Sequence, residues 1–234
     1  MITLAHQTIH DTKPSVSPVA GEVLVRWVSS GQVTGPASIQ QSSELNWGQI
    51  DEQVLSAVLN NQYLMGRTTP LFINVSDVTL SSCEMLSNYC HLLGQIVRRY
   101  KGTVVVEVPE TSPLTGRALE MCLSQFRMAG AKVAIDDFGV EHADMSRLDG
   151  HEWDYCKLAL PSVAYTPTLD WLITLQQKCR DRDIQVVCEQ IERISDLELI
   201  RIFPTAWAQG FAYAMPEMLI EPANDFRDSK CANF

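Results

Sequence analysis

Six apolar segments of this 234-residue chain end on, or one residue short of, a polar side chain that can bind a metal ion or a water molecule. These side chains are Asn74, Glu107, the pair Asp136-Asp137, Lys157, Glu189 and Gln209. Carboxylate and amide oxygens are ligands that favour Mg²⁺ or Mn²⁺ over zinc. The repeated position of these side chains therefore indicates one site for hard divalent cations.

Carboxylates that share a cavity repel one another and raise their own pKa values, and divalent cations relieve this repulsion. Two such ions about 3.5–4 Å apart form the usual clamp for in-line phosphoryl displacement. The chemistry indicated is metal-assisted hydrolysis of a phosphodiester. For any one carboxylate the alternative stays open that it faces a loop and caps the next helix. The shared position on three separate segments favours a common site.

The elements that would position these residues alternate between short β-branched runs and longer amphipathic runs, which is typical of βα units around a parallel sheet. Runs near 3–10 and 18–27 predict an antiparallel hairpin, and further strands are expected at 71–75, 103–108, 132–136, 154–158, 184–189 and 205–209. Helices are expected at about 48–65, 82–100, 112–129, 168–182 and 195–203, with Ser81 and Ser195 as N-caps and Gly130 as a C-terminal stop.

Counted with the hairpin, these strands are enough to close a small barrel. The fold class predicted is α/β, a TIM-like (β/α)8 barrel with an antiparallel first strand. In such barrels the C-terminal ends of the strands converge on one face, where the active sites lie. Residues 29–47 are polar and are expected to form a flexible loop.

The second strand of the hairpin carries Glu22, Leu24 and Arg26 on one face, since successive strand residues alternate between faces. If that face is the barrel interior, a carboxylate and a guanidinium point into the mouth, where they need a counter-ion, a metal or a phosphate. The apolar residues at 23, 25 and 27 make the opposite register equally compatible with the pattern.

Length and composition limit the class of protein. A chain of this length suits one α/β barrel, so a single domain over 1–234 is expected, with a polar C-terminal tail from about 217. No apolar run reaches the roughly 20 residues of a membrane helix, and the N-terminus lacks the order of a signal peptide. We therefore expect a cytoplasmic protein with no membrane association.

The formal net charge of −10 argues against binding to duplex nucleic acid, which needs a positive surface. A phosphate ligand could still bind where metal ions supply positive charge. The seven cysteines are scattered and are expected to be reduced thiols. His6 and His10 are spaced as a helical metal pair, but their segment is predicted to be a strand.

Taken in order, these motifs resemble the EAL-domain phosphodiesterases of bacterial second-messenger signalling over nearly the whole chain. The matching segments are Gln7-Thr-Ile9, Glu22-Val-Leu24-Val-Arg26-Trp27 with Val23 in place of the usual Ala, Phe72-Ile-Asn74-Val-Ser76, Glu107-Val-Pro-Glu110-Thr111, Ile135-Asp136-Asp137-Phe138-Gly139, Lys157, Cys188-Glu189-Gln-Ile-Glu192 and Gln209-Gly210-Phe211. Any one of these motifs is common, whereas all of them in the family's order and spacing are specific.

The resemblance implies a role for each matching residue. Glu22, Asn74, Glu107 and Asp136 would hold a first metal ion, and Asp137 and Glu189 would complete the site of a second. Lys157, Glu189 and Gln209 would be catalytic, Lys157 by orienting and helping to deprotonate the water between the metals. Arg26 would contact a substrate phosphate beside Leu24 and Glu192, and Glu110 would anchor the loop after Gly139.

The implied reaction is the hydrolysis of cyclic di-GMP (c-di-GMP) to linear pGpG with two Mg²⁺ or Mn²⁺ ions per site. Ca²⁺ would inhibit this reaction, because its looser coordination geometry misplaces the attacking water. The resemblance also implies a homodimer formed through the helices that flank the loop after Gly139.

This chain departs from the family pattern around the second metal position. Residues 140–145 replace the usual Thr-Gly-Tyr-Ser-Ser-Leu, and Glu141 stands where the pattern has a flexible glycine. Ala159 replaces an aspartate, and Gln190 replaces a glycine. Changes around metal ligands commonly cost about 10–100-fold in affinity or activity, so we expect a slow or regulated enzyme.

Two alternatives remain open. The first is a non-catalytic EAL module that acts as a c-di-GMP receptor or binds a protein partner. The second is an unrelated metal-dependent barrel hydrolase or lyase, which would require the order of the motifs to be a coincidence.

Overall fold

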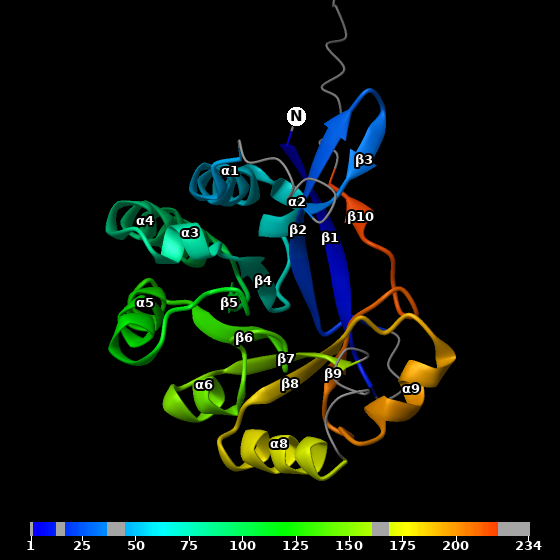
Figure 1. Ribbon diagram of the computed structural model, residues 1–234. Coiled ribbons are helices and arrows are strands. Elements are labelled where there is room, and N and C mark those ends of the chain that lie inside the picture. The colour runs from blue at the N-terminus through cyan, green and yellow to red at the C-terminus, as the bar shows by residue number, and fades with distance from the viewer. Residues whose placement is uncertain (1, 13–16, 37–44, 161–168, 220–234) are drawn as a thin grey trace, which may run out of the picture.

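The computed structural model of the chain describes residues 2–12, 17–36, 45–160 and 169–219. Eight strands form a closed barrel in the order β1-β2-β4-β5-β6-β7-β8-β9, and β9 pairs with β1. β1 runs antiparallel to both of its barrel neighbours, whereas the pairings from β2 through β9 are parallel. Helices lie around the outside of these strands (Figure 1). The predicted α/β barrel with an antiparallel first strand is confirmed.

The barrel strands are β1 (Ile2–Asp11), β2 (Ala20–Ser29), β4 (Leu71–Asn74), β5 (Val104–Val108), β6 (Lys132–Phe138), β7 (Tyr155–Ala159), β8 (Gln185–Glu189) and β9 (Trp207–Ala208). The helices are α1 (Trp47–Asn60), α2 (Gln62–Met65), α3 (Asp77–Leu80), α4 (Cys83–Arg99), α5 (Gly116–Met128), α6 (Met145–Gly150), α8 (Leu169–Asp181) and α9 (Ile194–Ile200). None of the helices in the described ranges is long and apolar enough to cross a membrane.

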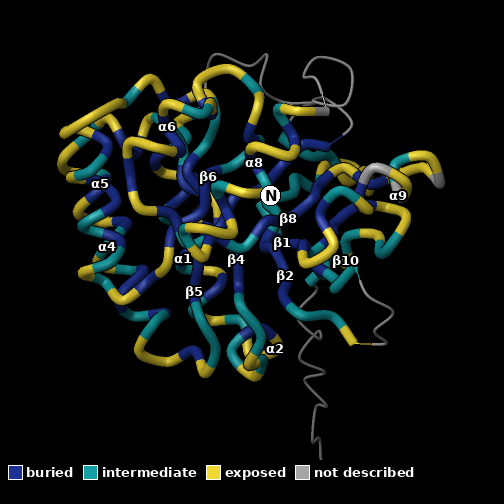
Figure 2. The backbone as a smooth tube through the Cα atoms, turned by 90° about the horizontal axis from the view of Figure 1, so that it is seen from below, coloured by how far each residue is buried: buried dark blue, intermediate teal, exposed yellow. Residues whose placement is uncertain are grey.

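The barrel strands carry two packed layers because their residues alternate between faces. One layer fills the barrel and consists of Ile9, Ala20, Phe72, Val105, Ala134, Tyr155 and Val187, with Val19 and Trp207 packed against it. The other layer, with residues such as Ile73, Val106 and Ile135, packs under the helices. The buried strands are surrounded by a partly exposed outer ring (Figure 2).

The inner apolar layer determines where the polar site residues lie. Glu22, Asn74, Glu107, Asp136, Lys157, Glu189 and Gln209 each stand two positions after an inner-layer residue of the same strand segment. They therefore point to the same side of their strands as that layer, one step nearer the mouth of the barrel. Because all seven residues have this position relative to the apolar layer, they form one polar layer at the barrel mouth.

α3 and α6 are short helices that were not predicted, and one predicted helix is divided into two. The single helix expected over 48–65 is wrong, because Asn61 is extended (φ −82°, ψ 109°) and its side chain caps α2 by accepting from the N–H of Leu64 at 2.9 Å. Asparagine favours such caps over the middle of a helix, since its side chain competes for backbone hydrogen bonds. A polar residue between two apolar stretches thus divides the helix.

Two of the predicted caps are also wrong. Ser82, not Ser81, caps α4 by accepting from Met85 N–H, and Ser81 ends α3. Ser195 lies inside the first turn of α9, where the carboxylate of Asp196 accepts from two preceding N–H groups. Gly130 follows α5 with φ +91°, the left-handed conformation of a helix stop, as predicted.

Two strand pairings lie outside the barrel proper and were not predicted. β3 (Gln32–Thr34) pairs with β2 inside the segment expected to be a loop. β10 (Glu217–Met218) pairs with β1, so the first residues of the expected tail belong to the sheet. Residues 37–44 of the expected loop and 220–234 of the expected tail lie outside the described residues.

Candidate active site

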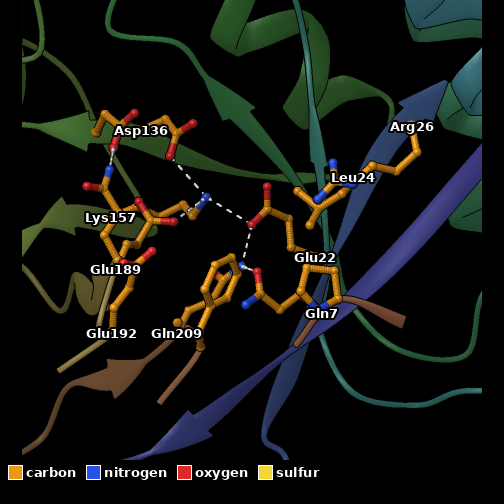
Figure 3. A pocket seen from close by; sticks show the side chains of 14 residues that line it. Gln7, Glu22, Leu24, Arg26, Asp136, Lys157, Glu189, Glu192 and Gln209 are labelled. Atoms are coloured by element: carbon orange, nitrogen blue, oxygen red, sulfur yellow. Dashed lines mark hydrogen bonds and ion pairs between the residues drawn. The ribbon is translucent and has the colours of Figure 1, made fainter. Parts of the chain in front are cut away.

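The ammonium of Lys157 lies at the centre of the polar layer in the barrel mouth (Figure 3). Its Nζ lies 3.5 Å from Glu22 Oε2, 3.0 Å from Asp136 Oδ1 and 2.8 Å from Glu189 Oε1. It also forms an ion pair with Glu107 Oε1. Because Lys157 is only 2% exposed, one buried cation holds four carboxylates that come from four different strands.

Glu22 faces the barrel interior, which settles the register of β2. Oε1 of Glu22 accepts from Asn74 Nδ2 at 2.9 Å, and Oε2 accepts from Gln209 Nε2 at 2.6 Å. The structure therefore places the three residues of one strand face, Glu22, Leu24 and Arg26, toward the mouth, and the opposite register is excluded. Leu24 and Arg26 line the cavity above the polar layer (Figure 3).

Asp136 and Asp137 both line this cavity although they are neighbours in one strand. Neighbouring strand residues normally point to opposite faces. Here the pairing of β6 with β7 shifts register between Ile135 and Phe138, and Asp137 has φ +39°. This irregularity turns the second carboxylate back into the mouth and brings it beside the first.

Burial and mutual repulsion control the protonation of the acidic side chains. Burial, together with the charge of Glu22, raises the pKa of Glu107 well above its usual range. Burial and the neighbouring Asp136 raise the pKa of Asp137 to about 7. Burial also raises the pKa of Glu189, although the charge of Lys157 opposes the shift.

Neighbouring groups favour the charged forms of Glu22 and Lys157. Burial alone would raise the pKa of Glu22, but the charge of Lys157 and the hydrogen bonds from Gln209 and Asn74 lower it. Burial also opposes the charge of Lys157, but the surrounding carboxylates, first of all Asp136, raise its pKa well above the usual range. The surroundings of Glu22 and Lys157 therefore favour the ion pair between them.

The donor set of the site suits hard cations. Five carboxylates face one ammonium, and Oε2 of Glu107 and Oε1 of Gln209 are buried without a hydrogen-bond partner. Such an excess of buried negative charge is relieved by divalent cations. Across the described ranges, however, no three His, Cys, Asp or Glu side chains are arranged to hold one ion, because their oxygens surround Lys157 instead. Bound cations would compete with Lys157 for these oxygens.

Two cavities adjoin the polar layer and share Glu22, Leu24, Arg26 and Asp136 as walls. The first, of about 320 Å³, is bordered by site residues and by Gln190, Glu192 and Phe211. The second, of about 450 Å³, extends toward α1 and is bordered by Trp47, Ile50 and Glu110 among others. Glu192 and Glu110 thus lie on opposite sides of the shared wall.

The backbone of Glu110 contacts residues 140–145, the loop that departs from the family pattern. Its carbonyl accepts from His142 N–H at 3.1 Å, and Gly139 N–H donates to Ala143 O at 2.7 Å within the loop. The structure gives the carboxylate of Glu110 no hydrogen bond to described loop residues, so a side-chain anchor is not seen. Glu141 has φ +44°, a conformation that glycine adopts more easily.

Arg147, Gln7 and Asp51 support the site, although no role was predicted for them. Arg147 is 5% exposed and donates to the carbonyls of Pro109, Ser112 and Leu114, which binds the loop after β5 to α6. The sequence gives only a weak indication of this role, because Arg147 lies in a polar segment where an arginine is expected to be exposed.

Gln7 and Asp51 accept hydrogen bonds from Gln209 and from Ser76, which follows Asn74. Oε1 of Gln7 accepts from Gln209 Nε2 at 3.2 Å. Oδ2 of Asp51, in α1, accepts from the N–H and the hydroxyl of Ser76, which follows the Asn74 strand. An acidic residue within the apolar face of a helix is the signal that could have identified Asp51.

Together, the fold and the site define a barrel protein with an acidic pocket organised around one lysine at the C-terminal ends of its strands. The family model for the EAL domain matches residues 2–216. The chain belongs to the EAL domain family.

Among curated proteins, the cyclic di-GMP phosphodiesterase PdeB of Shewanella oneidensis is 27% identical over 240 residues. This match covers 96% of the chain but only 28% of PdeB, so the chain spans little more than a quarter of that relative. Its similarity therefore concerns one part of a longer protein.

Solved structures share the fold at low identity. The EAL enzyme Bd1971, in a form with cAMP and c-di-GMP bound, has a TM-score of 0.75 at 18% identity, over 93% of this chain and 62% of its own. The YkuI protein of Bacillus subtilis, which has an EAL domain and was solved with substrate c-di-GMP and calcium, has a TM-score of 0.73 at 18% identity. That match covers 94% of this chain and 57% of YkuI.

Proposed function

We propose that this chain is a metal-dependent phosphodiesterase that hydrolyses c-di-GMP to linear pGpG. The observation that carries the proposal is the buried Lys157, which forms ion pairs with four carboxylates from four strands at the barrel mouth. EAL-family membership and the name of the PdeB relative give the substrate. The full activity, substrates and partners of the protein belong to the same proposal, because the relative extends well beyond the matched part.

The residues of the polar layer divide into two sets of ligands in this proposal. Glu22, Asn74, Glu107 and Asp136 would hold one cation, and Asp137 and Glu189 would complete the site of another. Mg²⁺ or Mn²⁺ fits these oxygen donors, and two such ions would neutralise the phosphate and polarise its P–O bonds. Ca²⁺ would bind with looser geometry and inhibit.

Lys157 and Glu189 would handle the proton in this mechanism. Their Nζ and Oε1 atoms lie 2.8 Å apart, within hydrogen-bond distance. Glu189, in contact with this ammonium, would take the proton that the attacking water loses and pass it to the leaving oxygen. Gln209 would keep Glu22 oriented through the hydrogen bond between their side chains.

The two cavities suit a ligand with two similar halves. c-di-GMP carries two guanosines joined by two phosphodiester bonds, and the shared wall of Leu24 and Arg26 lies between the cavities. The guanidinium of Arg26 would bind a phosphate at this wall. Glu192 in the first cavity can accept hydrogen bonds from the N–H groups of a guanine edge.

A second candidate function is a c-di-GMP receptor with little or no turnover. The observation that favours it is Lys157 itself, which already neutralises part of the acidic cluster at the point where cations would bind. In that case the same cavities would bind the nucleotide and a protein partner would read the bound state. The single domain over 1–234, a homodimer and a cytoplasmic location remain predictions under either candidate.

Chromatography of the purified chain after incubation with c-di-GMP tests the proposal. With Mn²⁺ or Mg²⁺ we expect pGpG, and with EDTA or Ca²⁺ we expect none. Glu22→Gln, which removes one charge from the buried centre, should reduce the rate at least about 100-fold. Glu84→Gln on the exposed start of α4 is the matched control and should retain the wild-type rate. Binding of c-di-GMP without pGpG would instead support the receptor.

A further inference from the structure

Gln190 connects the end of β8 to the second carboxylate of β6. Its Nε2 donates to Asp137 Oδ1 at 3.1 Å, and both residues line the cavity at the barrel mouth. β7 separates the two strands in the sheet, so this hydrogen bond reaches across the strand that carries Lys157. Gln190 is exposed at the mouth, directly after the buried Glu189.

Both ends of this hydrogen bond have an unusual backbone. Asp137 has φ +39° and Gln190 has φ +59°, within the left-handed region that favours glycine. Aspartate tolerates this region better than glutamine, whose longer side chain gains no local hydrogen bond from it. The EAL pattern has a glycine at this position. The strained backbone at Gln190 therefore calls for a compensating contact, and the contact observed is the one to Asp137.

Among the five carboxylates proposed as metal ligands, Asp137 is the one without an ion pair to Lys157. Within the described ranges the ion pairs of Lys157 go to Glu22, Glu107, Asp136 and Glu189. The side-chain hydrogen bond that fixes Asp137 comes from Gln190. Two different groups thus orient the carboxylates of this site: an ammonium orients four of them, and an amide orients the fifth.

We propose that Gln190 is a positioning residue for the second cation, because its amide donates to the carboxylate of Asp137 and holds it in the cavity beside Asp136. This inference rests on the proposed function, since it assumes that Asp137 is a metal ligand. The amide that would fulfil this role belongs to a residue that departs from the family pattern, in which a glycine stands at this position.

Titration of the purified protein with Mn²⁺ alone, followed by calorimetry and by the electron paramagnetic resonance of free Mn²⁺, tests this role without turnover. Wild type should bind two ions. Gln190→Gly, which removes the amide and relieves the backbone, should weaken one of the two sites about 10–100-fold and leave the other unchanged. Gln177→Ala is the matched control, since Gln177 donates to Asp181 on exposed α8 at 2.6 Å, away from the site.

Further variants separate the contact from the backbone. Gln190→Asn keeps an amide and suits the positive φ but is one methylene shorter, so it should weaken the same site. In an Asp137→Asn background, Gln190→Gly should cause no further loss, because the two residues act through one contact. A thermal melt of each variant shows that the fold is retained.

Several results would overturn the inference. If each of the two sites binds Mn²⁺ with the same affinity in Gln190→Gly as in wild type, the amide does not position a ligand. Tighter binding in Gln190→Gly would show that the amide competes with the ion for Asp137. Wild type that binds no Mn²⁺ would overturn the proposed function as well, whereas the first two results would overturn only the role of Gln190.

Discussion

The amide of Gln209 donates to Oε2 of Glu22 at 2.6 Å, so residues 187 positions apart in the sequence meet at the barrel mouth. Gln209 follows β9 and Glu22 lies in β2, and β1 pairs with both strands to close the barrel. Closure of the barrel therefore fixes the carboxylate of Glu22, whose other oxygen, Oε1, accepts a hydrogen bond from Asn74.

Replacing this amide should affect activity more than stability. Gln209→Leu leaves Glu22 with its contacts to Asn74 and Lys157 but removes one orienting donor. We expect kcat to fall about 10–100-fold, with a loss of about 1–2 kcal/mol in the free energy of unfolding. Steady-state kinetics and denaturant unfolding measure the two effects. A variant with wild-type kcat would show that Gln209 does not position Glu22.

Removing the central cation should make stability depend on metal. Lys157→Met leaves the buried carboxylates Glu107 and Glu189 without their ion pair, which should cost about 3–5 kcal/mol in EDTA. Added Mn²⁺ should restore part of this loss, because it binds the folded state. Lys178→Met, which breaks an exposed ion pair with Asp149, is the control and should cost less than about 1 kcal/mol. Equal losses for the two variants would contradict the central role of Lys157.

His6 should make the fold sensitive to mild acid. Burial lowers the pKa of His6 from 6.5 to about 4, and Arg67 adds to the shift. Between these pH values the unfolded chain binds a proton that the folded chain does not, so stability falls as pH falls from 6.5 toward 4 and is unaffected by this group above 6.5. The shift corresponds to at most about 3 kcal/mol.

The variant His6→Phe keeps a ring in this position and removes the titration. Its unfolding free energy, measured at steps between pH 7 and pH 4, should fall less steeply than that of wild type. The difference between the two curves isolates His6 from the acidic residues that also titrate in this range. Parallel curves would show that His6 has the same pKa in the folded and the unfolded protein, and would contradict the lowered pKa.

Arg147 should be needed to hold the loop after β5. Its guanidinium donates to three carbonyls, whereas a lysine ammonium cannot reach all of them. Arg147→Lys should therefore destabilise the fold by at least about 2 kcal/mol and should speed hydrogen exchange in residues 109–115. Arg117→Lys on the exposed face of α5 should change neither quantity. Unchanged exchange in Arg147→Lys would refute this role.

Most of the polar layer could be predicted because it depends on a local rule. A strand places every second residue on one face, so a polar residue two positions beyond an inner apolar residue must face the mouth. This holds for Glu107 after Val105 and for Glu189 after Val187. The register of β2 could not be predicted, since it depends on the pairing of Glu22 with Gln7 and Phe72 on separate strands.

Other features depend on contacts that no local pattern encodes. Asp137 faces the cavity only because β6 shifts its pairing with β7. The division between α1 and α2 arises from one asparagine cap, and the role of Arg147 depends on a loop more than 30 positions away. β10 forms because the chain returns to β1 after the barrel has closed. Tertiary structure decides each of these features.

A single-turnover assay can detect hydrolysis of c-di-GMP by the Lys157 site even if turnover is slow. Purified protein in excess over c-di-GMP is incubated with Mn²⁺, stopped at intervals and separated by chromatography. We expect complete conversion to pGpG in wild type, no conversion in EDTA, and a loss of at least about 100-fold in rate for Glu22→Gln. Substrate that stays bound and intact in wild type with Mn²⁺ would contradict the proposed hydrolysis.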